Sequence, residues 1–248
     1  MDDYKCNGVN IVIGAISLLQ RKALQIMPPP ESNCLPAKGG LSGPAFFPEG
    51  LGLSELHLLR GSEMPRIIAV GHNFGCVDYR AAIELVGRED DKPTWRNLDR
   101  ILSKAGICPE SCFRTNWFIG LLLGSSQMGK FLRAPDKSYE VQCNRILIDQ
   151  ISLIKPRVLL LLGPEVASRA YQIAPTLAPW RGAKRWIDID HSSIGPSPRD
   201  VEIPGAGLRV NVTAILHPSF GAANEGRRMR NMSQPITEAE LIRAAIID

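Results

Sequence analysis

The chain has 248 residues, of which 44% are hydrophobic and 22% are charged, and its net charge is +4. This length allows one substantial hydrophobic core, and the composition is typical of an ordinary globular protein rather than a disulfide-rich scaffold. A net charge of +4 permits a nucleic-acid partner but does not indicate one. We therefore expect a single domain over residues 1–248.

The six cysteines lie far apart and have the spacing of neither a disulfide framework nor a zinc site. We therefore expect reduced thiols, no bound metal and a cytoplasmic protein. The apolar run over residues 11–19 is too short to cross a bilayer, which needs about 20 residues, and acidic rather than basic residues precede it. We interpret this run as a buried helix or strand and expect no contact with a membrane.

Residues 1–45 form an N-terminal extension that is hard to interpret, because Pro28-Pro29-Pro30 and several glycines interrupt it. From residue 65 onward, strands and helices alternate. Apolar runs predict four strands, over residues 66–70, 111–116, 158–162 and 209–216. Helical spacing and capping residues predict helices over 95–105 and 138–154, a helix opening at Gly163-Pro164-Glu165, and a last helix from about residue 237.

This alternation predicts an α/β fold with three α/β/α layers around a central, mainly parallel, four-stranded sheet. Residues 183–208 are rich in proline and glycine and are expected to form an irregular insert. Parallel strands end at one edge of a sheet, and open α/β sheets bind their ligands at that edge. Because Asn73, Asn116 and His217 each follow or end a predicted strand, the sequence predicts that they meet in one pocket.

These three side chains suit the binding of a planar heterocycle. A neutral His217 can donate a hydrogen bond, and the Asn116 amide offers an acceptor and two donors, as the edge of a nucleobase requires. Asn73 can hold a water molecule but cannot strongly deprotonate it. The sequence has neither the carboxylate pair of a glycosidase nor a metal cluster. We therefore expect the pocket to orient a ring and to stabilise charge on one of its oxygens.

Three motifs, in this order, resemble the uracil-DNA glycosylase superfamily from about Gly71 to Asn224. They are Gly71-His72-Asn73-Phe74-Gly75 after the first strand, Thr115-Asn116 at the end of the second, and His217-Pro218-Ser219 after the last. The asparagine of the first motif resembles the mismatch-specific and single-strand-selective branches, and Ala222-Ala223-Asn224 resembles the latter. Residues 98–102 and 143–163 are more similar to the iron-sulfur branch.

The resemblance implies a monofunctional glycosylase of base excision repair that hydrolyses the N-glycosidic bond of uracil in DNA without a cofactor. The nucleotide would be flipped out of the duplex into the pocket. Asn116 would bind the N3 and O4 edge of the base, His217 would donate to O2, and Asn73 would position the attacking water. Either Trp95 or Phe74 would stack on the base. The other substrate-binding residues that the motifs imply are Gly71, His72, Gly75 and Ser219.

The resemblance also implies that the loops around the pocket bind DNA. Their basic residues would neutralise phosphates, and these residues are Lys130, Arg133, Arg227, Arg228 and Arg230. Phe220 would fill the place that the flipped base leaves in the stack. The expected partner is DNA containing uracil or another damaged base, bound by a monomer.

The chain departs from the family pattern at three positions. Phe74 stands where a proline usually follows the asparagine, which changes the wall of the water site. Gly75 stands where the strictly uracil-specific branch has a tyrosine that excludes a 5-methyl group, so we expect a wider range of bases. Among the cysteines, only Cys143 corresponds to a ligand of the iron-sulfur branch, so we expect no cluster.

Two other functions fit the same residues. A fold with weakened catalysis would be a module that binds uracil-bearing or abasic DNA, and Phe74 keeps this alternative open. A hydrolase of free nucleosides or nucleotides would need the pocket but not the basic loops. Structural interpretations also remain, with Asn73 and Asn116 as turn residues, His217 as a capped histidine, and the arginines as a solvated face.

Overall fold

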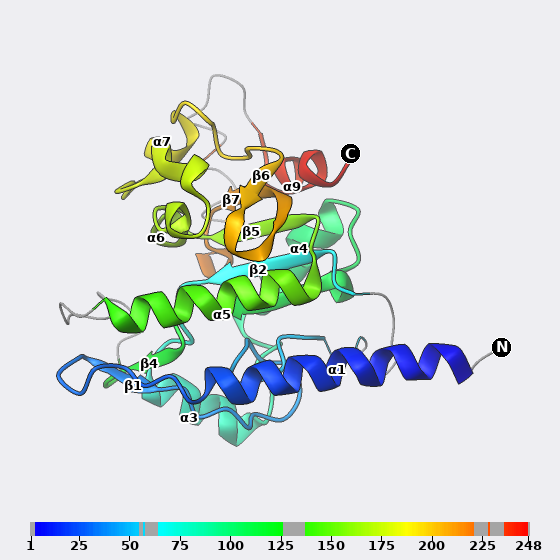
Figure 1. Ribbon diagram of the computed structural model, residues 1–248, viewed down its shortest axis with the longest axis vertical. Coiled ribbons are helices and arrows are strands. Elements are labelled where there is room, and N and C mark those ends of the chain that lie inside the picture. The colour runs from blue at the N-terminus through cyan, green and yellow to red at the C-terminus, as the bar shows by residue number, and fades with distance from the viewer. Residues whose placement is uncertain are drawn as a thin grey trace.

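The computed structural model describes residues 3–54, 57, 64–125, 137–220, 228 and 236–247. It has the predicted three-layer α/β/α fold, with a five-stranded sheet in the order β3-β2-β5-β7-β6 (Figure 1). The four predicted strands are present and parallel, as β2 (Ile67–Gly71), β3 (Cys112–Asn116), β5 (Val158–Leu162) and β7 (Leu208–Ile215). The central sheet therefore has one strand more than the four that the sequence predicted. An antiparallel edge strand, β6 (Val201–Ile203), comes from the segment expected to be irregular.

The sheet separates two hydrophobic clusters, one on each face. On one face, alternate residues of the strands pack against α5 (Ser138–Ile154), which has the predicted bounds. On the other face, the intervening strand residues pack against α4 (Pro93–Lys104) and α9 (Glu238–Ile246). The predicted capping box of α9 is present, because Thr237 and Glu240 each accept a hydrogen bond from the other's backbone. Burial on both faces explains why β2 and β5 have no polar alternation.

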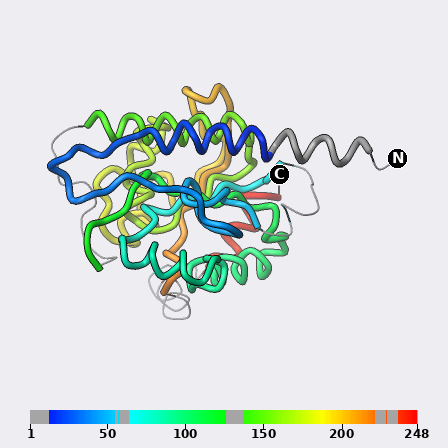
Figure 2. The backbone as a smooth tube through the Cα atoms, turned by 90° about the horizontal axis from the view of Figure 1, so that it is seen from below, coloured from blue at the N-terminus to red at the C-terminus, as the bar shows by residue number. Residues whose placement is uncertain are grey.

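The N-terminal segment packs against the sheet domain instead of extending away from it. Helix α1 (Asp3–Ala23) contains the apolar run 11–19, which is therefore helical, and it runs alongside α5 (Figure 2). Strand β1 (Cys34–Pro36) pairs with β4 (Gly120–Leu122). Residues 45–52 then lie beside β3, where the Phe47 N–H donates to the Arg114 carbonyl at 3.0 Å.

The remaining helices lie next to the ends of strands. Helix α3 (Val77–Val86), which the sequence patterns did not predict, follows β2, and Gly87 ends it in the left-handed conformation with φ 79°. The helix expected at Gly163 is the single turn α6 (Pro164–Ala167), and α7 (Trp186–Asp190) lies in the irregular segment. Within the described parts of the chain, none of the helices has the length and apolar character that a membrane span requires.

A buried ion pair fastens the N-terminal segment to α3. The Arg80 Nε atom lies 2.9 Å from Oε2 of Glu49, whose side chain is fully buried. The Nη2 atom of Arg80 donates to the Gly39 carbonyl at 2.7 Å, and the Lys38 N–H donates to the other Glu49 oxygen at 2.8 Å. The Arg80 guanidinium therefore connects α3 to two places in the N-terminal segment, at Gly39 and at Glu49.

We expect Arg80→Ala to lower the free energy of unfolding by about 3 kcal/mol, because it leaves the Glu49 carboxylate buried without its cation. Urea denaturation monitored by circular dichroism measures this change. The matched control is Lys22→Ala, which removes an ion pair with Asp149 in which the lysine side chain is 54% exposed, and its cost should stay below about 1 kcal/mol. Equal effects of the two substitutions would contradict the role given to Arg80.

Candidate active site

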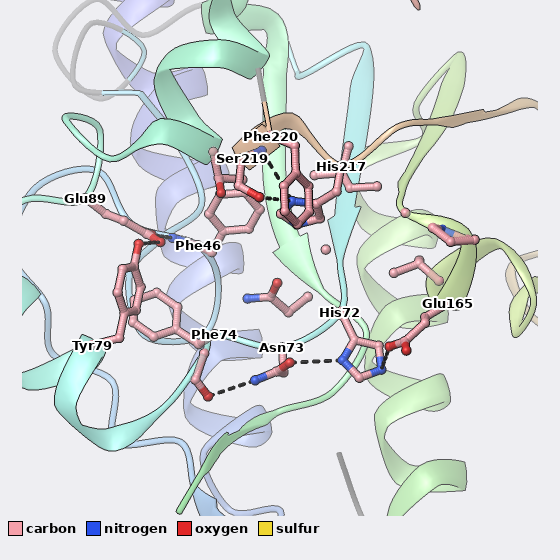
Figure 3. Close-up of a pocket in the computed structure, with 18 residues that line it drawn as sticks. Phe46, His72, Asn73, Phe74, Tyr79, Glu89, Glu165, His217, Ser219 and Phe220 are labelled. Atoms are coloured by element: carbon pink, nitrogen blue, oxygen red, sulfur yellow. Dashed lines mark hydrogen bonds and ion pairs between the residues drawn. The ribbon is translucent and has the colours of Figure 1, made fainter. Parts of the chain in front are cut away.

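A cavity of about 400 Å³ lies at the carboxyl ends of the parallel strands (Figure 3). Gly71 ends β2, Asn116 ends β3, Gly163 follows β5 and His217 follows β7, and all four residues line the cavity. The first motif adds residues 72–75, and the turn after His217 adds Ser219 and Phe220. The strand ends therefore bring together polar side chains that are as far apart in the sequence as Asn73 and His217.

Asn116 contributes a buried amide to the cavity wall. Asn116 is 6% exposed, and it pairs with Gly71 in the register of β2 and β3. A Cβ atom at position 71 would lie only 2.5 Å from Asn116 Oδ1, so the amide occupies space that only glycine leaves open. The Nδ2 atom is buried and has no hydrogen-bond partner among the described residues. Such a donor costs about 1–3 kcal/mol unless a bound group accepts from it.

His217 is held in one tautomer by the turn that follows it. The Ser219 N–H donates to His217 Nδ1 at 3.3 Å, and Ser219 Oγ lies 2.8 Å from the same nitrogen. Because Nδ1 accepts, the hydrogen of the neutral ring is on Nε2. Burial, with a smaller effect of His72, lowers the pKa of His217 to about 4. The ring is therefore a neutral hydrogen-bond donor at physiological pH.

Helix α4 packs against this turn and holds it through a hydrogen bond. The Asn97 Nδ2 atom donates to the Pro218 carbonyl at 2.8 Å, which fixes the backbone between the histidine and Ser219. Asn97 is a positioning residue that the motifs did not indicate, although it lies one position before the Leu98–Leu102 segment that resembles the family.

The Asn73 amide is held between two neighbours in its own motif. Its Nδ2 donates to the Gly75 carbonyl at 2.8 Å, and its Oδ1 lies 2.9 Å from His72 Nδ1 (Figure 3). The Nε2 atom of His72 lies 3.5 Å from Oε2 of Glu165, which lines the same cavity. Burial is the main cause that lowers the pKa of His72, and Glu165 partly opposes it.

The aromatic wall of the cavity differs from the sequence prediction. Phe74 lines the cavity, but Trp95 does not, so the proposed stacking by Trp95 was wrong. The indole is buried behind Phe46, with ring centroids 5.6 Å apart in an edge-to-face arrangement, and Arg114 covers its face. Of these two rings, Phe46 is the one that lines the cavity. It comes from a segment that none of the motifs reaches, so no sequence pattern indicated it.

Tyr79 occupies the space that Gly75 was expected to leave open. Gly75 has φ 102°, and a Cβ atom there would lie 3.1 Å from the Tyr79 ring. The Tyr79 hydroxyl donates to Glu89 Oε1 at 3.1 Å, and the Phe46 N–H donates to Oε2 at 2.8 Å. Glu89 is buried in the cavity wall, and burial raises its pKa to about 7. The Tyr79 ring, from the first turn of α3, therefore takes up space that the sequence analysis expected Gly75 to leave open.

The family model of the Uracil DNA glycosylase superfamily matches residues 60–239. The chain belongs to this superfamily. A search of curated proteins finds no match. The superfamily match covers the motifs at Gly71–Gly75, Asn116 and His217, but it begins after Phe46. Membership makes the protein a DNA glycosylase in the broad sense, a hydrolase of N-glycosyl bonds with DNA as its partner.

For a superfamily member that binds DNA, the cations around the cavity need to face solvent. Arg228 does not, because its side chain is buried and its Nη2 atom lies 2.9 Å from Asp190 Oδ1, with Glu238 on its other side. The prediction that Arg228 contacts phosphate was wrong, since a buried guanidinium between two carboxylates is structural. The other predicted cations, Lys130, Arg133, Arg227 and Arg230, lie outside the described residues. Phe220 is 56% exposed at the mouth of the cavity.

A metal site or a disulfide would require close spacing of the described acidic groups and thiols. In the chain as far as the structure describes it, no three His, Cys, Asp or Glu side chains are grouped so that they could hold a metal ion. None of the five cysteines with described side chains forms a disulfide. Cys143, the position similar to the iron-sulfur branch, is buried in α5, and burial raises the pKa of its thiol to about 12.

The tautomer and charge of His217 can be checked by NMR of the histidine rings. We expect His217 to titrate near pH 4, because its folded-state pKa is depressed from the ordinary 6.5. The unfolded chain then takes up the proton first as the pH falls. The stability that depends on neutral His217 is complete above pH 6.5 and is lost as the pH falls toward 4. A titration midpoint near 6.5 would show that the ring is not held as described.

Proposed function

We propose that the protein is a monofunctional uracil-DNA glycosylase that starts base excision repair by hydrolysing the N-glycosidic bond of uracil. The observation that supports this most directly is the buried Asn116 Nδ2 donor, which has no partner among the described residues and lies in the same cavity as the His217 donor. A flipped uracil offers acceptors for both groups. Free volume of about 400 Å³ is ample for one base.

Asn116 supports selection of uracil over cytosine. Its Nδ2 would donate to O4 and its Oδ1 would accept from N3–H, whereas cytosine presents a donor and an acceptor in the reverse order. Oδ1 is the end of the amide that lies beside Gly71. Leaving a buried polar group unpaired makes the wrong base unfavourable, so a single fixed amide can discriminate.

His217 supports the departure of the base. As the C1′–N1 bond breaks, the electron pair moves to the base and negative charge gathers on O2. The Nε2–H of a neutral His217 would donate to that oxygen, and the hydrogen bond strengthens as the charge develops. Because burial keeps the ring neutral, the donor does not depend on protonation near pH 7.

Phe46 and Phe220 support the grip on the flipped nucleotide. Phe46 and Asn116 both line the cavity, and both lie within 4 Å of the place that a Cβ atom of Gly71 would take, as expected for a ring that stacks on a base bound by Asn116. Such stacking contributes about 1–3 kcal/mol per base. Phe220 stands exposed at the mouth, where it could enter the base stack. We further propose that a monomer acts in the cytoplasm, where its cysteines stay reduced.

We expect His217→Ala and Asn116→Ala each to slow single-turnover release of uracil by about 10²–10³-fold, because each removes a donor to an oxygen of the base. Release of free uracil from single- and double-stranded oligonucleotides measures this. The matched control is His191→Ala, an exposed histidine outside the cavity, which should keep the wild-type rate. Circular dichroism should show that all three variants remain folded.

Two outcomes would redirect this assignment. Tight retention of uracil-bearing or abasic DNA without release of base by the wild type would favour the alternative of a DNA-binding module. Release from free deoxyuridine as fast as from an oligonucleotide would favour a nucleoside hydrolase. Absence of both release and binding would reject the proposed function altogether.

The Tyr79 ring leads to a prediction about the range of bases. Because this ring fills the space beside Gly75, we expect the wild type to release uracil at least about 10-fold faster than thymine, since a 5-methyl group would meet the ring. Tyr79→Ala should reduce this ratio several-fold, and Tyr79→Phe, which keeps the ring, should preserve it. Release from paired uracil and thymine mismatch oligonucleotides measures the ratio. An unchanged ratio in Tyr79→Ala would place the selection elsewhere.

A further inference from the structure

The cavity contains two histidines whose hydrogen bonds fix opposite tautomers. Asn73 Nδ2 donates to the Gly75 carbonyl, which can only accept, so the Asn73 oxygen is the atom that faces His72. That oxygen can also only accept, and therefore Nδ1 of His72 carries a hydrogen. In His217 the hydrogen is on Nε2, because the Ser219 N–H donates to Nδ1. The Nε2 atom of a neutral His72 can therefore accept a proton, whereas the Nε2 atom of His217 carries a hydrogen and donates it.

The surroundings of His72 favour a neutral ring at rest that can still take up a proton. The titratable and charged groups that face it in the described structure are Glu165 on α6, Arg169 just after α6, and His217 after β7. Burial and Arg169 lower the pKa of His72, whereas Glu165 raises it. With Glu165 Oε2 at 3.5 Å from Nε2, a proton arriving at this nitrogen would form an imidazolium–carboxylate pair.

Hydrolysis of the glycosidic bond needs such a proton acceptor. When the oxygen of water bonds to C1′, it must lose a proton, and the Asn73 amide cannot take it. Glu89 is a buried carboxyl in the same cavity, but it lies at the other end, bonded to Tyr79 and to the Phe46 backbone (Figure 3). His72 and Glu165 lie on the same side as Asn73, the residue expected to hold the water.

We propose that His72, paired with Glu165, is the catalytic base that accepts the proton of the attacking water, an inference that rests on the proposed function. The C1′–N1 bond breaks and its electron pair leaves with the base, which Asn116 and His217 hold as an anion. The water oxygen bonds to C1′, and one water proton moves to Nε2 of His72. Glu165, whose side chain is 68% exposed, then passes the proton to solvent.

The position of this histidine makes the role specific to this chain. His72 stands between the glycine and the asparagine of the first motif, at a position to which the family resemblance assigns no catalytic group. Here that residue is bonded directly to the side chain that follows it, at 2.9 Å. The weak basicity of the Asn73 amide is therefore offset by a titratable neighbour.

The first test measures the tautomers and does not require activity. We expect ¹⁵N NMR of the folded protein near pH 7.5 to show His72 protonated on Nδ1 and His217 protonated on Nε2, with signals assigned by the His72→Gln and His217→Ala variants. A His72 ring that carries its proton on Nε2 could not accept another there in the neutral state. That result would overturn the inference whatever the enzyme does.

The second test measures single-turnover uracil release against pH. We expect the wild-type rate to rise with pH through the pKa of His72, which lies below 6.5, and then to level off. His72→Gln keeps a donor for Asn73 but cannot take up a proton, so its plateau should fall about 10²-fold and lose this pH dependence. Added imidazole should partly restore release by His72→Ala.

Glu165→Gln provides a signature that a purely structural role would not give. Because the carboxylate raises the pKa of His72, its removal should move the midpoint of the pH–rate profile to lower pH, with a loss in rate of only a few-fold. The control Glu202→Gln, at the exposed side chain of the edge strand β6, should change neither the midpoint nor the rate. An active wild type with His72→Gln equally fast and equally pH-dependent would overturn the inference and leave the proposed function standing. An inactive wild type would instead reject the function.

Discussion

The register between β2 and β3 is the constraint on which the site depends. It places Gly71 opposite Asn116, and the missing side chain of the glycine is the space that the amide occupies, with only 2.5 Å to a hypothetical Cβ. A shift of one residue would turn Asn116 to the other face of the sheet. The position of the buried Asn116 donor, which has no partner in the part of the chain that the structure describes, follows from this pairing of two parallel strands.

Hydrogen bonds from neighbouring residues then give two similar rings different roles. His217 and His72 lie in the same cavity, and burial keeps both near neutrality. A serine N–H fixes one ring as a donor, and an asparagine oxygen fixes the other as an acceptor. Groups whose surroundings separate their behaviour in this way are a common basis for acid and base roles in one site. Neither ring needs to carry charge before the substrate binds.

Much of this arrangement could be predicted from the sequence, because it depends on local patterns. The apolar run of β5 gave its bounds, and the polar residues at the strand ends indicated the edge where they meet. What could not be predicted depends on contacts between distant segments. No sequence pattern shows whether the Trp95 ring or the Arg228 guanidinium lies at the surface. Both are buried, and this depends on how distant segments pack around them. The extra strand β6 arises from a proline-rich segment for a similar reason.

The aromatic wall shows that the cavity is built from more of the chain than the family match covers. Phe46 lies before residue 60, where the superfamily match begins, yet its ring faces the cavity and its N–H is bonded to Glu89. The same carboxyl holds the Tyr79 hydroxyl, so the ring expected to stack on the base and the ring expected to limit its size share one anchor. Because burial brings the pKa of Glu89 to about 7, this anchor changes charge within the neutral range. Ionised Glu89 accepts both hydrogen bonds more strongly than the neutral acid does, so the positions of the Phe46 and Tyr79 rings are linked through one carboxyl group.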